Sequence, residues 1–593
     1  MTAAIRSKQI PFLAMIVVVA DSLCAGDLGR EVSISSHVPD GDEYAMSISD
    51  ILRHGEELFS ANWTWQEGGG RPLTKGTGAP LSDQTRPLIF PRNFNRVSAP
   101  DANSCAGCHN SPVTGGNGDI VANVFVLGQR FDFATFDPTN DVVTGEARDE
   151  SGDLATLNTI ANSRATLGMF GSGFIEMLAR QITVELQAQR DGLEPGDSVE
   201  LSAKGIGFGS LSRRADGTWD TSRIEGIAAM SLIADGSETS PSLIIRPFHQ
   251  AGNVISIRQF SNNAFNHHHG IQSMERFGTD TDPDGDGHQN EMTRGDMTSV
   301  SVFQAAMAVP GRVIPRDPEI ELAVLNGEAQ FLAVGCARCH VPHLGLDQNG
   351  WIYTEPNPFN PPNNLQPGDA PLYSVDLTSQ ELPQPRLNVL EGVVYVSAFT
   401  DFKLHDISSG AGDPNNEVLN MNRALGSEEF FQGNRKFLTR KLWGAASKPN
   451  FFHHGKFTTM RQAILAHDGE AATERDAFVD MNDYDRNSLI EFLKTLKNLP
   501  AGTESLFVDE EFEPRQWPPA RFQSVEHISD ARFRLQWGGG DALYTEPRLF
   551  QLQLKESVDA AGWETVGEPT STNSMEIEFL GDQGFFRLVP VTE

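Results

Sequence analysis

The 593-residue sequence predicts a mainly α protein with two helical domains in series and a small β-sandwich at the C-terminus. Three observations carry this prediction. The motif Cys-x-x-Cys-His occurs twice, at residues 105–109 and 336–340, and each copy follows a segment with the character of a short helix. From about residue 520 the pattern changes to alternating apolar and polar residues, which is typical of half-buried strands.

Each Cys-x-x-Cys-His motif has the spacing that binds one c-type haem. Its two thiols can add to the vinyl groups of a haem, and the following imidazole can coordinate the iron. A Cys₄ zinc site is the alternative for two such pairs. The pairs lie more than about two hundred residues apart, however, and both carry the additional histidine. We therefore expect two covalently bound haem c groups, held by Cys105, Cys108, His109, Cys336, Cys339 and His340.

The first residues have the form of a secretory signal, which we place at residues 1–25. Arg6 and Lys8 precede an apolar run from Ile10 to Ala20 that is too short to span a bilayer. No other run is long and apolar enough to be transmembrane, so we expect a periplasmic or secreted protein and not an integral membrane protein. Export agrees with c-type haem, which bacteria attach outside the cytoplasm.

The composition excludes one class of partner. A formal net charge of −33 argues against binding to nucleic acid, because phosphate backbones need a basic surface. Solubility in an extracytoplasmic medium is one reason for such acidity. Attraction of a basic redox partner is another.

The second motif lies in the frame of a compact c-type cytochrome domain. Residues 327–331 predict a short helix before the haem site, and residues 485–496 predict a closing amphipathic helix with leucines at helical spacing. We assign residues 326–500 to this domain, which lies within the usual range of domain sizes.

The first motif has a longer version of the same frame. Residues 55–59 resemble the opening helix, but about fifty Gly-, Pro- and Asn-rich residues then predict a long loop before Cys105. Residues 242–246 read as a strand. We assign residues 45–325 to an N-terminal haem domain elaborated with long loops and some strands.

The tail, residues 520–593, differs in kind from the haem domains. Apolar residues alternate in the segments 533–537, 550–554 and 575–579, which predicts strands of a small antiparallel β-sandwich. No cluster of metal-binding or catalytic residue types occurs there, so we expect an accessory domain.

Several segments resemble the di-haem oxidoreductase family, whose members are relatives of bacterial di-haem cytochrome c peroxidases. The resemblance covers roughly residues 50 to 500, and the segments that carry it are residues 94–104, 402–406, 442–444, 452–456 and 466–471. In the peroxidase relatives one haem relays an electron and the other leaves an iron position open for hydrogen peroxide. The resemblance implies that the N-terminal haem is the reaction site and the C-terminal haem the relay.

The resemblance also implies a second ligand for the C-terminal haem. In the relatives this ligand is a methionine in a short helix, and here residues 462–469 carry His467 in its place. We expect His467 to bind the iron of the His340 haem and to lower its potential, because a stronger donor stabilises ferric iron. The alternative is a surface histidine at a helix end.

Glu176 is the candidate group for proton transfer at the N-terminal haem. Peroxide cleavage needs a general base, and the apolar segment 171–177 would raise the pKa of this carboxyl. The segment also resembles the Glu-Met pair of the peroxidases. A buried structural carboxylate is the alternative. Residues 267–269 are three consecutive histidines that we expect to lie near a haem, without assigning ligation.

A calcium site is predicted from the loop that begins at residue 282. Asp282, Asp284 and Asp286 occupy positions 1, 3 and 5 with glycine at position 6, which is the order of calcium loops. The usual glutamate at position 12 is replaced by threonine, so Glu291, Asp280 or Asp296 must supply further oxygens. A solvated acidic turn is the alternative.

Together these patterns predict an exported di-haem c-type oxidoreductase with peroxidase-like activity. Its small-molecule oxidant would be hydrogen peroxide or oxygen, and a redox partner protein would supply the electrons. One alternative is a pure electron-transfer cytochrome whose irons both have six ligands. Another is an enzyme that uses the open haem to oxidise an organic or protein substrate.

Overall fold

The computed structural model describes residues 28–69, 104–118, 120–123, 162–282, 287–417, 427–447 and 450–518 of the body, with positions 420, 422 and 423. In the tail it describes residues 521–529, 531–538, 549–555, 557, 562–570, 574–579 and 584–591. The predicted secretory signal and most of the long loop before Cys105 lie outside these residues.

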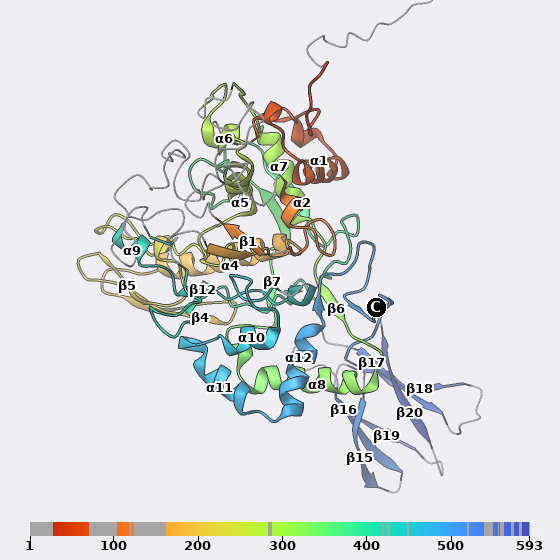
Figure 1. The fold of residues 1–593 in the computed structure, drawn as a ribbon. Coiled ribbons are helices and arrows are strands. Elements are labelled where there is room, and N and C mark those ends of the chain that lie inside the picture. Colours follow the sequence, from red (N-terminus) through yellow and green to blue (C-terminus); the bar gives the residue numbers. More distant parts are fainter. Residues whose placement is uncertain are drawn as a thin grey trace, which may run out of the picture.

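The described residues form a mixed α and β protein, so the prediction of a mainly α fold is wrong. Helices occupy both ends of the body, and many small sheets lie between them and in the tail (Figure 1). Helices are present at residues 55–59 and 327–331 and over most of residues 485–496, as expected, but strands are more numerous than the expected few strands of the N-terminal domain. Within the described residues, none of the helices is both long and apolar enough to cross a membrane.

The N-terminal helices gather around the first motif. Helix α1 begins after Ser47, whose side chain accepts a hydrogen bond from the backbone N–H of Asp50. The helix packs against α7 through buried Leu58 and Phe59. The helices of this group are α1 (Ile48–Ser60), α2 (Cys105–Cys108), α5 (Ile257–Ala264), α6 (Met274–Phe277) and α7 (Arg294–Ala305).

The C-terminal helices repeat this arrangement around the second motif. Helix α8 packs against α12, and Phe331, Leu489 and Phe492 form the centre of their shared core. Helix α8 begins at Pro318, so it crosses the predicted domain boundary at residue 325. The helices of this group are α8 (Pro318–Ala333), α10 (Met460–Leu465), α11 (Ala472–Asp480) and α12 (Asp483–Lys494), whereas the short helix α9 (Glu428–Phe431) lies apart from them (Figure 1).

A close helix contact is common to both pairs. Gly55 of α1 lies against the backbone oxygen of Ser299 in α7, and Gly327 of α8 lies against that of Ser488 in α12. A Cβ atom at either glycine would come within 2.3 Å and 2.0 Å of these oxygens. Both glycines begin the sequence Gly-Glu-x-x-Phe, so the repeated sequence encodes the repeated packing.

The middle of the body joins the two helical groups. Helix α4 (Ser172–Asp191) and several sheets share one large core, whose residues come from both sides of residue 325. The antiparallel sheets here are β3 (Ser198–Ala203), β4 (Ile206–Arg213) and β5 (Trp219–Ile224); β7 (Leu344–Leu346) with β10 (Val394–Val396); β8 (Ile352–Glu355) with β9 (Tyr373–Asp376); and β11 (Leu404–Asp406) with β12 (Lys436–Leu438). The predicted strand at residues 242–246 is an irregular extended segment in which Leu243 has a φ of 52°.

Two further small sheets complete the body. Strands β1 (Ile120–Asn123) and β2 (Asn162–Ala165) form an antiparallel pair beside the first motif. Strand β6 (Gly311–Val313) pairs with β13 (Leu496–Lys497) and, in parallel, with β14 (Phe507–Val508). The second sheet ties the chain after α12 to the segment before α8.

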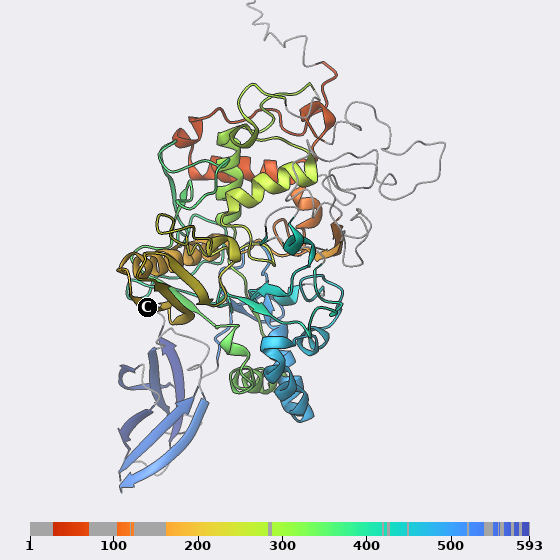
Figure 2. The ribbon, with the colours of Figure 1, turned by 90° about the vertical axis from the view of Figure 1, so that its left-hand side faces the viewer.

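The tail extends away from the body (Figure 2). The predicted strands are present, but they form two separate three-stranded sheets, and the prediction of a β-sandwich is wrong. Only Leu535, Leu552 and Ile577 are fully buried among the described tail residues, which is a small core for a sandwich. The sheets are β15 (Arg521–Ser529), β16 (Arg532–Gly538) and β19 (Ser574–Glu578), and β17 (Leu549–Lys555), β18 (Glu564–Thr570) and β20 (Phe585–Val591).

Candidate di-haem site

Both Cys-x-x-Cys-His motifs open into one cavity of about 450 Å³. The cavity wall includes all six predicted attachment and iron-binding residues, and also Phe59 and Phe331 from the two Gly-Glu-x-x-Phe segments. The wall is predominantly apolar, as expected for a site that encloses a large apolar group. The fold therefore brings together two motifs that lie far apart in the sequence.

The imidazoles of the two motifs are oriented in the same way. His109 Nδ1 lies 2.8 Å from the backbone oxygen of Leu167, and His340 Nδ1 lies 3.2 Å from that of Phe399. A carbonyl oxygen only accepts, so Nδ1 carries the proton and Nε2 keeps a lone pair for a metal. Burial lowers the pKa of each imidazole to about 4, which keeps both rings neutral, as ligation requires.

The four thiols of the two motifs are better suited to haem attachment than to zinc binding. Burial raises the pKa of Cys105 and of Cys336 to about 12, so neither is a reactive thiolate in this environment. Among the residues that the structure describes, the ligand atoms of the four cysteines do not converge. The group that does converge there is Cys339, Asp401 and His405. The Cys₄ zinc alternative therefore lacks support.

His467 lies in the same cavity, at the end of helix α10. This helix begins with a capping box in which Thr459 and Gln462 satisfy each other's backbone N–H groups. His467 Nδ1 lies 2.7 Å from the backbone oxygen of Ala463, so its Nε2 is also free for a metal. Burial lowers the pKa of His467, which favours a neutral ring, and both His340 and His467 line the same cavity. The geometry agrees with the predicted ligand pair.

The histidine cluster lies beside the first motif. Residues Phe265–His269 form a π-helical turn, a rare feature that often marks functional sites, and Gly270 ends it at a φ of 73°. His268 and His269 line the cavity, and His269 Nε2 lies 3.6 Å from Cys105 Sγ. The charge of His268 acts on the pKa of His109. The side chain of His267 lies outside the described part of the structure.

Glu176 is not part of the cavity wall. It is fully buried, and its carboxylate binds Arg180 at 2.5 Å, the backbone N–H of Ile257 at 2.7 Å and the side-chain amide of Asn357 at 2.7 Å. With these partners the carboxylate anchors α4 to the start of α5. The prediction that Glu176 transfers a proton at the haem has no support from this position, and the structural alternative fits it.

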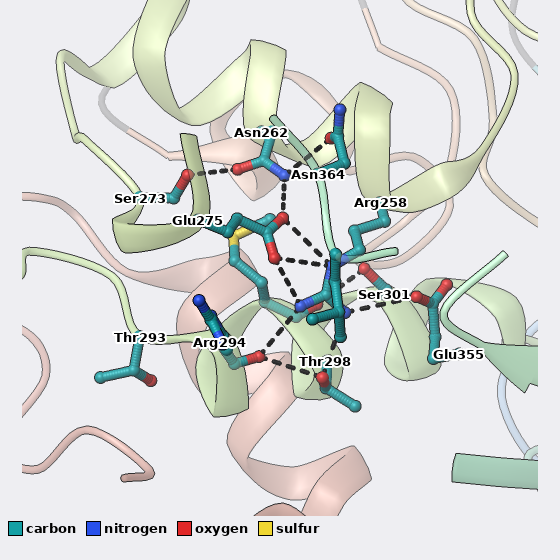
Figure 3. A network of polar contacts seen from close by, with 12 residues as sticks. Arg258, Asn262, Ser273, Glu275, Thr293, Arg294, Thr298, Ser301, Glu355 and Asn364 are labelled. Carbon is teal, nitrogen blue, oxygen red and sulfur yellow. Dashed lines mark hydrogen bonds and ion pairs between the residues drawn. The ribbon is translucent and has the colours of Figure 1, made fainter. Parts of the chain in front are cut away.

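The residue after Ile257 extends this buried network (Figure 3). Arg258 is fully buried and forms ion pairs with Glu275 at 2.8 Å and with Glu355 at 3.3 Å. Burial opposes its charge, but the two carboxylates outweigh burial and raise the pKa of Arg258. The network holds α5 and α7 in place on one side of the first motif.

His405 sits between two carboxylates on the cavity wall. It binds Asp401 at 2.9 Å and Glu470 at 2.8 Å. Burial opposes its protonation, but the hydrogen bond to Asp401 raises the pKa of His405. His405 is therefore a cation that is held between Asp401 and Glu470 beside the second motif. Asp401 lies four residues before His405 in the sequence and was not among the predicted site residues.

The calcium prediction is only partly within the described residues, because Asp284 and Asp286 lie outside them. Asp282 accepts a hydrogen bond from the backbone N–H of Gly287 at 2.9 Å. Glu291 is buried and binds the backbone N–H of Gln272, while Asp296 binds two histidines. Asp280 is the remaining candidate that faces the loop, where it pairs with Asn290. Calcium binding stays a prediction.

Residues 371–496 match a family model described as "Di-haem oxidoreductase, putative peroxidase". This match confirms the family resemblance. The matched part contains His405, Arg440, Lys441 and His467, and it begins after both Cys-x-x-Cys-His motifs. No curated protein matches the sequence.

One of the solved structures that are similar to the chain aligns over a large part of it. It is hydrazine synthase from Kuenenia stuttgartiensis under xenon pressure, which is 12% identical. The alignment covers 84% of this chain and 100% of that chain, with a TM-score of 0.28. At this score the similarity carries no argument about fold or function.

Proposed function

We propose that the protein is an exported di-haem c-type oxidoreductase with peroxidase-like activity. Its N-terminal haem is the reaction site and its C-terminal haem relays electrons from a redox partner protein. The observation that carries the proposal is the single cavity into which both Cys-x-x-Cys-His motifs open. Bound haem supplies one-electron redox chemistry and, where an iron position is open, peroxide cleavage.

The residues around the two predicted haem positions differ. At the second motif, His340 and His467 both present Nε2 within one cavity, which favours a closed iron. At the first motif, His268 and His269 lie on the wall beside His109. Because Glu176 lies elsewhere, these two imidazoles are described groups beside the first motif that can accept and return a proton there. We therefore assign proton transfer at the N-terminal haem to His268 or His269 and not to Glu176.

The same histidines favour a second candidate function. If His268 or His269 closed the first iron, the protein would be an electron-transfer cytochrome without peroxide turnover. The 3.6 Å distance from His269 Nε2 to Cys105 Sγ shows that this imidazole reaches the first motif. The two functions differ in the number of open iron positions.

Electron paramagnetic resonance of the ferric holoprotein tests the proposal. One high-spin and one low-spin iron are expected for the peroxidase-like function. Two low-spin signals that neither peroxide nor half-reduction changes would support the electron-transfer function instead. Mass analysis of the intact chain should first show two covalently bound haems and the loss of the signal segment.

His467→Gly tests the assignment of the relay haem. Removal of the imidazole should convert the low-spin C-terminal haem to high spin, and added imidazole should restore the low-spin signal. His527→Gly in the tail strand β15 is the matched control and should leave both signals unchanged. An unchanged spectrum in His467→Gly would remove this ligand from the proposal.

A further inference from the structure

Two adjacent cations, Arg440 and Lys441, line the cavity between the two motifs. The backbone of Arg440 lies against the ring of His340. Lys441 Nζ donates a 3.3 Å hydrogen bond to the backbone oxygen of Phe170, three residues after Leu167, which binds His109. The pair therefore reaches from the second iron-binding position towards the first.

Neither cation has a carboxylate partner among the residues that the structure describes. Arg440 Nη1 donates a 3.4 Å hydrogen bond to the backbone oxygen of Phe452, and Lys441 makes the contact with Phe170. Two adjacent, half-buried like charges on an apolar cavity wall, without a counter-charge among the described residues, are unfavourable, so this site favours an anion.

The remaining acidic and basic side chains of the cavity wall already have partners. Each forms an ion pair at 2.8 Å: Glu470 with His405, Glu474 with Arg338 and Arg475 with Asp468. No carboxylate of the wall is therefore left to compensate Arg440 and Lys441. A negatively charged ligand that enters the cavity can compensate these two cations.

We propose that Arg440 and Lys441 together bind a carboxylate in this cavity. A guanidinium offers two parallel N–H donors that match a carboxylate, and the ammonium adds a mobile point charge. The carboxylate comes from a haem propionate or from a small free acid. The inference rests on the proposed function for the propionate, because that source exists only if haem is bound.

The effect of this pair is measurable as a reduction potential. A cation beside a propionate compensates its negative charge, and removal of the cation leaves that charge to stabilise ferric iron. Lys441→Met should therefore lower the midpoint potential of at least one haem. A tenfold rise in the ferric to ferrous ratio corresponds to about 59 mV for a one-electron couple, and we expect a shift of that order.

Spectroelectrochemical titration of the holoprotein provides the test. The variants are Lys441→Met, the charge-keeping Lys441→Arg and the control Lys494→Met, which removes a surface ion pair with Glu491. Each is titrated in a buffer free of carboxylates and again with added acetate. A lower potential of Lys441→Met in the first buffer assigns the propionate. A difference from the wild type that appears only with acetate assigns a free carboxylate.

Equal potentials of the wild type and Lys441→Met in both buffers would overturn the inference. If Lys441→Met does not retain haem, Arg440→Gln is titrated in the same way, with the same expectation. Haem content is measured first by mass and absorbance. A wild-type protein without haem contradicts the proposed function, whereas a protein with two haems and insensitive potentials contradicts the carboxylate site alone.

Discussion

At the scale of single residues, the partners of a side chain decide its role more than its immediate sequence does. The apolar segment around Glu176 suggested a carboxyl with a raised pKa, but Arg180 lies one helical turn later and pairs with it. That i, i+4 spacing was visible in the sequence. Asn357 and Ile257, which complete the site, lie far along the chain and could be found only in the fold.

Glu176→Gln tests this structural role. The substitution leaves Arg180 buried without its counter-charge, so the free energy of unfolding should fall by about 3 to 5 kcal/mol. Peroxide turnover per folded molecule should stay unchanged. Urea unfolding and steady-state kinetics measure the two effects, with the exposed Glu200→Gln as control. A large loss of turnover in a fully folded variant would return Glu176 to catalysis.

The buried carboxylate of Asp296 gives a prediction of pH dependence. His37 binds it at 2.6 Å and His54 at 2.7 Å. Burial would raise the pKa of Asp296, but the hydrogen bonds from the two histidines hold this pKa below its usual range. Burial would lower the pKa of His37, but the contact with Asp296 raises it. The carboxylate contribution to stability is present above about pH 4 and is lost as the pH falls through the folded pKa. The His37 contribution is present below about pH 6.5 and is lost as the pH rises through the folded pKa.

Asp296→Asn should therefore lower the free energy of unfolding most between about pH 4 and pH 6.5, by about 3 kcal/mol. The deficit relative to the wild type should shrink at more acidic and at more basic pH. Urea unfolding across the pH range measures it, and the exposed Asp280→Asn is the control. A deficit that does not vary with pH would show that the histidines do not stabilise the carboxylate.

At the scale of elements, the sequence was informative where a local pattern repeats. Both Gly-Glu-x-x-Phe segments became helices whose glycine touches a serine carbonyl of the facing helix, and each phenylalanine reaches the cavity. The tail strands were also predicted, since alternation needs no distant information. How sheets associate depends on contacts between strands that are not neighbours, which explains why the sandwich was wrong.

Gly327→Ala tests the close helix contact. If helix propensity alone mattered, the variant would gain about 1 kcal/mol, because alanine favours a helix over glycine. The new methyl group would instead meet the Ser488 oxygen, and we expect a net loss of about 2 kcal/mol as α8 and α12 separate. Thermal or urea unfolding decides the sign. Ala329→Gly on the exposed side of α8 should lose about 1 kcal/mol from propensity.

At the scale of the whole molecule, the site depends on the meeting of both helical groups. The sequence specified each motif, yet nothing in it indicated that the two motifs share one cavity or that Arg440 and Lys441 lie between them. Adjacent cations such as Arg440 and Lys441 are common on protein surfaces, so nothing in the sequence distinguished this pair. Their importance follows from their place on the cavity wall and from the ion pairs that the charges around them already form.

The tail and the body should be separable. The tail core consists of tail residues, whereas Val508 and Trp517 pack into the body and Trp517 Nε1 binds Glu328 at 2.8 Å. A chain that ends at residue 518 should keep both haems, their potentials and the unfolding midpoint of the body. A chain that ends at residue 505 loses β14 and Trp517, whose burial alone is worth about 3 kcal/mol, so its midpoint should fall clearly. Equal losses in both truncations would show that the tail sheets stabilise the haem-bearing body.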